Sequence, residues 1–164
     1  MYKKGFTLLE LLLVISIMGV LATLIIGNFL TSIKKGRDSK RKQDLQTVQK
    51  ALELYFEDNK TYPVSSTYVP NIPLCHPNGC GTGNTAGATY IQKTPADPTS
   101  GYNYSYISTD GKSYKLYACL ENDQDVGPGV KLLNGAQDTS NGYPGTTCGS
   151  CKCMFGVSSP NTTP

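Results

Sequence analysis

One carboxylate stands alone in an apolar stretch near the start of the chain. Glu10 is followed by residues 11–30, which contain no charged side chain. A carboxylate in apolar surroundings is costly unless a cation or a hydrogen-bond donor meets it. The apolar stretch holds no Lys, Arg or His, so the partner must come from elsewhere. A new amino terminus, made by a cut just before Phe6, would supply an amine.

The cysteines are the second group that could do chemistry. All lie beyond the apolar stretch: Cys75, Cys80, Cys119, Cys148, Cys151 and Cys153. An even number in a loop-rich region favours disulfides, and hence an oxidising compartment, with the pairing left open. Zinc is the alternative, because Cys148 and Cys151 have a two-residue ligand spacing and His76 lies beside Cys75. Only one such C-x-x-C pair exists, so we expect disulfides and no metal.

Acidic residues alternate through a predicted loop at Glu121, Asp123 and Asp125. Calcium prefers such oxygen ligands, but Gly127 comes one position late for an EF-hand and no acid closes the loop. We therefore expect no cofactor. Calcium near Asp123 and Asp125 is the alternative to a solvated acidic turn.

No catalytic constellation is present, so we do not expect an enzyme. The single histidine, His76, stands in a loop rich in Gly and Pro, and neither a phosphate-binding loop nor a nucleophile elbow occurs.

Basic residues concentrate just after the apolar stretch, at Lys34, Lys35, Arg37, Lys40, Arg41 and Lys42. The rest of the chain is near neutral or acidic, so nucleic acid is not an expected partner. We interpret the cluster as a helix face that contacts solvent, lipid or a neighbouring subunit, with DNA contact as the minority alternative. Taken alone, the positive-inside rule would place this cluster in the cytoplasm.

The apolar stretch and the residues after it predict one long helix. Residues 11–30 would rise about 30 Å, the thickness of a bilayer's hydrocarbon core, and no small-residue cleavage site follows them. Helix formers continue through residues 38–57, where Leu45, Val48 and Leu52 follow helical spacing. We predict a helix from about Phe6 to Asp58, with weak points at the glycines 27 and 36.

The remainder predicts a small antiparallel sheet. Residues 64–94 have turn chemistry and are expected to form an irregular loop. Residues 102–107 and 113–120, joined by a turn at Asp110 and Gly111, predict a hairpin that packs on the helix. Short strands are expected at 130–133 and near 152–157, followed by a frayed tail. The fold class is α+β, with a long N-terminal helix on a small antiparallel sheet.

The N-terminal residues resemble a known processing signal. Met1-Tyr-Lys-Lys-Gly5, then Phe6-Thr-Leu-Leu-Glu10 and the apolar run, resemble the signal of type IV prepilins and type II secretion pseudopilins. The resemblance implies a pilin-like fold and a prepilin peptidase that cuts after Gly5 and methylates Phe6. It also implies that Glu10 meets the terminal amine of a neighbouring subunit during assembly.

The body of the chain resembles major pseudopilins more weakly. Tyr62-Pro63 and Thr94-Pro-Ala-Asp-Pro98 carry this resemblance, together with the hairpin. Gly27 often corresponds to proline in the family, and major pseudopilins usually have few cysteines. A disulfide-bounded C-terminal region is common in type IV pilins, whereas a calcium site in that region is known for major pseudopilins. The choice between pilus and pseudopilus therefore stays open.

These resemblances imply a division of the chain. Residues 1–5 form a leader, 6–30 the transmembrane and filament-core helix, and 31–58 its amphipathic continuation. Residues 59–164 form a disulfide-stapled loop and sheet region that completes a globular domain with 38–58. The implied function is a structural subunit of a type IV pilus-like or type II secretion pseudopilus filament.

The implied partners are further copies in a helical filament, prepilin peptidase, an inner-membrane assembly platform with its ATPase, and membrane lipid before assembly. The subunit would cross the cytoplasmic membrane once, with its C-terminal domain extracytoplasmic, and later join an extracellular or periplasmic filament. The alternative is a non-assembling, single-pass, membrane-anchored binding module outside the cytoplasm.

Overall fold

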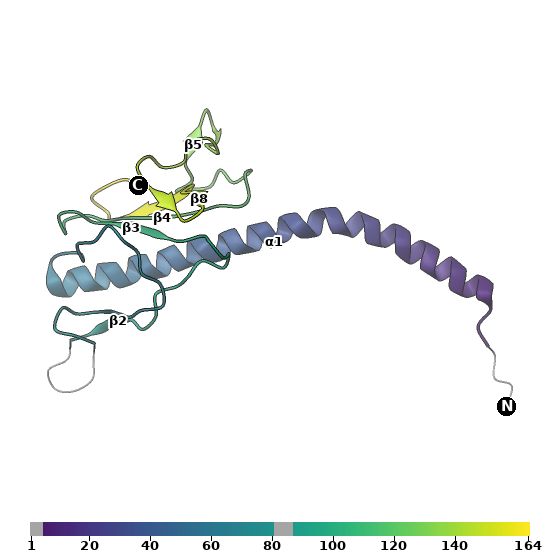
Figure 1. Cartoon of the computed structure of the whole chain (residues 1–164), viewed down its shortest axis with the longest axis horizontal. Coiled ribbons are helices and arrows are strands. Elements are labelled where there is room, and N and C mark those ends of the chain that lie inside the picture. The colour runs from purple at the N-terminus through teal and green to yellow at the C-terminus, as the bar shows by residue number, and fades with distance from the viewer. Residues whose placement is uncertain (1–4, 81–86) are drawn as a thin grey trace.

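A single long helix organises the fold. The computed structural model describes residues 5–80 and 87–164, with the backbone alone for residues 24–28. Helix α1 (Leu8–Asn59) spans 52 residues and curves along its length without a break (Figure 1). The prediction of one continuous helix is confirmed, and the backbone does not unwind at Gly36. The N-terminal half of α1 stands free, whereas the C-terminal half is packed into a globular domain.

Both ends of α1 are capped. Thr7 is the N-cap, with extended backbone angles, and its hydroxyl accepts a hydrogen bond from the N–H of Glu10. At the other end, Lys60 adopts the left-handed conformation (φ 56°), and its N–H donates to the carbonyl of Phe56 at 2.7 Å. The chain then turns back along the helix.

A three-stranded antiparallel sheet covers one side of α1. Its strands are β3 (Ser105–Ile107), β4 (Lys115–Ala118) and β9 (Phe155–Ser158), in the order β3-β4-β9. The predicted hairpin is therefore confirmed, and Tyr106 lies opposite Leu116. Its turn contains Gly111 at φ +68°, where an added Cβ would lie 2.2 Å from the hydroxyl of Thr61. Only glycine fits there.

The core lies between the predicted stripe of α1 and this sheet. Leu45, Val48 and Leu52 are buried, as the spacing predicts, and they pack with Leu116 and Phe155. Tyrosines supply most of the remaining core: Tyr62, Tyr104, Tyr106 and Tyr114. A core of this composition places many hydroxyls close to the helix, and these need partners.

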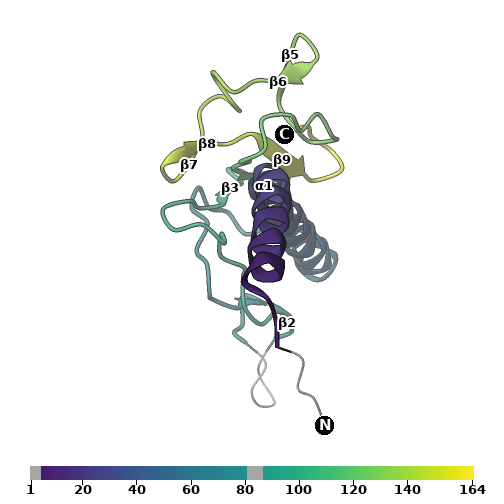
Figure 2. The same cartoon turned by 90° about the vertical axis from the view of Figure 1, so that its right-hand side faces the viewer.

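Three short antiparallel pairs complete the described part of the chain. They are β1 (Leu74–Cys75) with β2 (Thr89–Ile91), β5 (Leu132–Leu133) with β6 (Ala136–Gln137), and β7 (Thr147–Cys148) with β8 (Cys151–Lys152). Seen along α1, β2 lies on one side of the helix, and β5 and β6 lie on the other (Figure 2). The segment predicted as an irregular loop therefore contains the β1–β2 pair.

The tail is held rather than frayed. The hydroxyl of Ser158 donates to the carbonyl of Thr162 at 2.7 Å, and the side-chain amide of Asn161 donates to the carbonyl of Lys112 at 2.9 Å. The prediction of a frayed tail is wrong, because polar side chains in the tail itself make these contacts.

Candidate filament-assembly site

The predicted processing position lies just outside the helix. Gly5 and Phe6 precede the N-cap and have no regular secondary structure. Both are exposed, and Phe6 is 86% accessible. The peptide bond between them is therefore open to solvent.

Glu10 closes a capping box with Thr7. Its Oε2 accepts hydrogen bonds from the backbone N–H and the hydroxyl of Thr7, each at 2.9 Å, while Thr7 Oγ1 accepts from the N–H of Glu10 at 3.2 Å. The two residues thus satisfy N-terminal N–H groups reciprocally. Thr7 is a site residue that was not predicted, although the Thr-x-x-Glu spacing is a known signature of such a box.

The free half of α1 presents an apolar surface on every side. Its exposed apolar residues are Phe6, Leu8, Leu9, Leu11, Leu12, Leu13, Val14, Ile15, Ile17, Met18, Val20, Leu21, Phe29, Leu30 and Ile33. We call this segment, residues 6–33, the arm. Soluble monomers rarely expose so many large apolar side chains on one segment, which indicates a binding partner.

A membrane span is not found among the side chains that the structure describes. Over residues 5–23, 29–80 and 87–164, no helix combines the length and the apolarity needed to cross a bilayer. The predicted segment, 11–30, includes residues 24–28, whose side chains lie outside this description.

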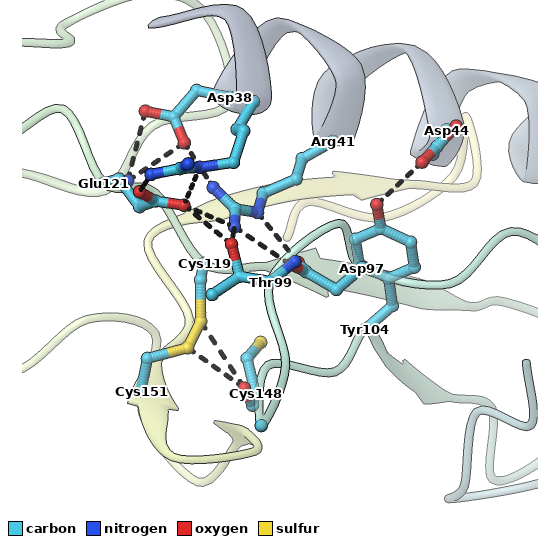
Figure 3. A network of polar contacts seen from close by, with 12 residues as sticks. Asp38, Arg41, Asp44, Asp97, Thr99, Tyr104, Cys119, Glu121, Cys148 and Cys151 are labelled. Carbon is cyan, nitrogen blue, oxygen red and sulfur yellow. Dashed lines mark hydrogen bonds and ion pairs between the residues drawn. A yellow bond between two sulfur atoms is a disulfide. The ribbon is translucent and has the colours of Figure 1, made fainter. Parts of the chain in front are cut away.

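An ion-pair cluster lies where α1 enters the globular domain (Figure 3). The guanidinium of Arg41 donates to Asp38 at 2.7 Å, to Asp97 at 2.8 and 2.9 Å, and to Glu121 at 2.7 Å. Thr99 Oγ1 accepts from Arg41 and donates to Glu121. The side chains of Arg41 and Asp97 are fully buried, and this cluster joins the helix to two loops by direct contacts.

The carboxylates decide the charge state of the cluster. Burial opposes the charge of Arg41, but hydrogen bonds to Asp97, Glu121 and Asp38 outweigh it and raise the pKa of the guanidinium. Hydrogen bonding from Arg37 is the largest effect on Glu121, and with Arg41 and Thr99 it lowers the pKa of that carboxyl to about 2 despite partial burial. Arg41 and Glu121 are therefore both ionised at neutral pH.

The basic cluster is consequently only in part the face toward solvent, lipid or a neighbouring subunit that we expected, and Lys40 is among its exposed members. Arg37 also pairs with Glu121, Lys42 pairs with Asp125 at 2.6 Å, and Lys40 pairs with Asp44 at 2.7 Å. Lys34 and Lys35 remain exposed. Apart from Asp38, the acids that pair with Arg37, Arg41 and Lys42 lie 56 to 84 residues further along the chain.

Two further carboxylates of α1 receive tyrosine hydroxyls from the domain. Tyr104 donates to Asp44 at 2.8 Å, and Tyr62 and Tyr114 donate to Glu53 at 2.9 and 2.8 Å. Burial first, and then these acceptors, raise the pKa of all three tyrosines. The helix is thus fixed to the sheet by polar as well as apolar contacts.

The six cysteines are joined in three disulfides, so the expectation of disulfides is confirmed. The pairs are Cys75–Cys80, Cys119–Cys151 and Cys148–Cys153, with Cα atoms 5.0, 6.2 and 5.3 Å apart. Because every cysteine sulfur is bonded to another, none is a thiolate that could bind zinc. Cys119, drawn with Cys151 in Figure 3, comes two residues before Glu121 of the Arg41 cluster.

Of the two residues considered as calcium ligands, Asp123 and Asp125, only one has a charged partner in the part of the chain that the structure describes. Asp125 is paired with Lys42, whereas Asp123 is exposed. Within residues 5–80 and 87–164, no group of three or more His, Cys, Asp or Glu is arranged to hold a metal ion.

Two protein families match the chain. The prokaryotic N-terminal methylation motif matches residues 1–26, and type II secretion system protein G matches residues 28–133. No solved structure matches the chain.

Curated relatives agree with the second family, and all three described here are named type II secretion system core protein G. The one from Vibrio cholerae is 32% identical over 78% of this chain and 87% of its own length. The one from Escherichia coli K12 is 34% identical over 75% of this chain and 83% of its own length. The one from Dickeya chrysanthemi is 30% identical over 87% of this chain and 97% of its own length. These matches, with a family match over more than half of the sequence, show that the chain belongs to the type II secretion system protein G family of pseudopilins.

Proposed function

We propose that the chain is the repeating structural subunit of a type II secretion pseudopilus and assembles through its arm. The observation that carries this proposal is the exposed apolar arm with Glu10 at its tip. Apolar arms of several copies would bury one another in a filament core, and the globular domains would form its surface. Before assembly, the arm would hold the subunit in the cytoplasmic membrane, with the domain on the extracytoplasmic side.

Processing by prepilin peptidase fits the geometry of the first residues. The Gly5–Phe6 bond lies before the N-cap and is exposed, so a peptidase would reach it without unwinding α1. The cut would place the new amine of Phe6 beside the capping box. Both hydrogen bonds that Glu10 accepts from Thr7 end on Oε2, which leaves Oε1 to accept from the amine of a neighbouring subunit.

The proposed partners are other pseudopilins, the peptidase, and the inner-membrane assembly platform with its ATPase. A type IV pilus is the second candidate, because two of the three disulfides staple the C-terminal region in the manner of many pilins. The match to protein G favours secretion.

Complementation distinguishes a secretion pseudopilus from a type IV pilus. The chain would be expressed in a strain that has a type II secretion system but lacks the protein G of that system. The assembly machinery that belongs with this chain would be expressed in the same strain. Short filaments in sheared fractions and restored release of a secreted enzyme are expected. Filaments without restored secretion would favour the pilus, and a cleaved chain that never forms filaments would contradict both candidates.

A further inference from the structure

The loop of residues 121–127 is held on α1 by charged side chains of the helix. Glu121, at its start, accepts from Arg37 and Arg41. Asp38 accepts from the backbone N–H groups of Glu121 and Asn122 at 2.9 and 2.8 Å. The first turn of the loop is therefore bound through both its side chain and its backbone.

Lys42 holds the other half of the loop. Its ammonium lies 2.6 Å from Oδ2 of Asp125 and 5.4 Å from the centre of the Phe155 ring. The Lys42 and Asp125 side chains are only 26% and 18% exposed, so solvent weakens this pair less than an open surface pair. Oδ1 of Asp125 accepts from the N–H of Gly127 at 3.0 Å, which closes the turn.

A metal ion fits this arrangement poorly. Calcium takes about six to eight oxygen ligands, and the two oxygens of Asp125 are already used by Lys42 and Gly127. A divalent cation at Asp125 would also meet the ammonium of Lys42 at close range, where like charges repel strongly. Among the residues that the structure describes, no cation pairs with exposed Asp123, and one carboxylate does not make a site.

We infer that Lys42, Arg37 and Arg41 take the place of a metal ion at this acidic loop, so that the domain folds without calcium. A cation that belongs to the chain cannot dissociate, and the loop therefore keeps its position on α1 whatever divalent ions the medium contains. The inference concerns the fold alone and does not depend on the proposed function.

Thermal unfolding of the full chain in detergent tests this inference. Near-UV circular dichroism of the buried tyrosines is the signal that monitors unfolding. The wild-type melting temperature is expected to be the same in millimolar calcium and in excess EGTA. Lys42→Gln should lower it by roughly 2–4 °C, and Lys42→Arg should restore most of that loss. Lys50→Gln, which changes an exposed lysine of the same helix, is the matched control and should leave it unchanged.

Calorimetric titration of the wild type with calcium gives a second measurement if Lys42→Gln does not fold. No saturable heat is expected. Saturable binding, or a wild-type melting temperature that rises by several degrees with calcium, would overturn the inference. A Lys42→Gln variant as stable as Lys50→Gln would overturn the part assigned to Lys42.

Discussion

Arg41 of α1 and Asp97 of the loop before β3 form an ion pair at 2.8 Å, and neither side chain reaches solvent. They are 56 residues apart in the chain. The same guanidinium also holds Asp38 and Glu121, so one side chain fixes two loops to the helix a few residues beyond the arm. This contact adds to the apolar core in fixing the domain on the helix that carries the arm.

Loss of Arg41 should therefore be severe. Arg41→Met leaves buried carboxylates without their cation and should cost about 3–5 kcal/mol in the free energy of unfolding. Urea unfolding, followed through the tyrosine signal, measures this cost. Lys50→Gln should change the value by less than about 0.5 kcal/mol. Equal stability of the two variants would show that the cluster does not anchor the domain.

Acid should weaken the same cluster through Glu121. Its pKa is lowered from 4.5 to about 2 in the folded chain, so its stabilisation is complete above pH 4.5 and is lost as the pH falls toward 2. Glu121→Gln removes this contribution. Urea midpoints measured from neutral to acidic pH should therefore converge for the wild type and the variant; curves that stay parallel would contradict the assignment.

The disulfides should differ in their effect on stability. Cys119–Cys151 closes a separation of 32 residues, whereas Cys75–Cys80 closes 5. In the chain-entropy account, the longer loop contributes roughly 3–4 kcal/mol and the shorter one less. Each cysteine pair would be replaced by serines, and the melting temperatures of the two variants would be compared. Loss of Cys119–Cys151 should lower the melting temperature more than loss of Cys75–Cys80. An equal or smaller decrease would contradict this prediction.

The roles of Glu10 and Thr7 can be distinguished by substituting each residue separately. Glu10→Ala should leave cleavage after Gly5 largely intact but prevent filament formation, because the neighbour's amine loses its partner. Thr7→Ala removes only the cap, at a cost of about 1 kcal/mol to the helix end, and should still assemble. Electron microscopy of sheared filaments compares them. Normal filaments from Glu10→Ala, or equal defects in both variants, would show that Glu10 has no role beyond capping.

The elements that depend on local pattern could be predicted from sequence. The helical spacing of Leu45, Val48 and Leu52 and the turn at Gly111 correctly placed α1 and the β3–β4 hairpin. The role of the basic cluster could not be predicted, because the acids that pair with it lie in distant loops. The local signs were Asp38, three residues before Arg41, and Asp44, four residues after Lys40. The cysteine pairing was equally open until the loops were placed.

The mass of the subunit recovered from filaments tests the central claim most directly. We predict a chain of 159 residues that begins with N-methylated Phe6, lacks residues 1–5 and contains no free thiol. A chain that still begins with Met1, from a host that contains an active prepilin peptidase, would contradict it.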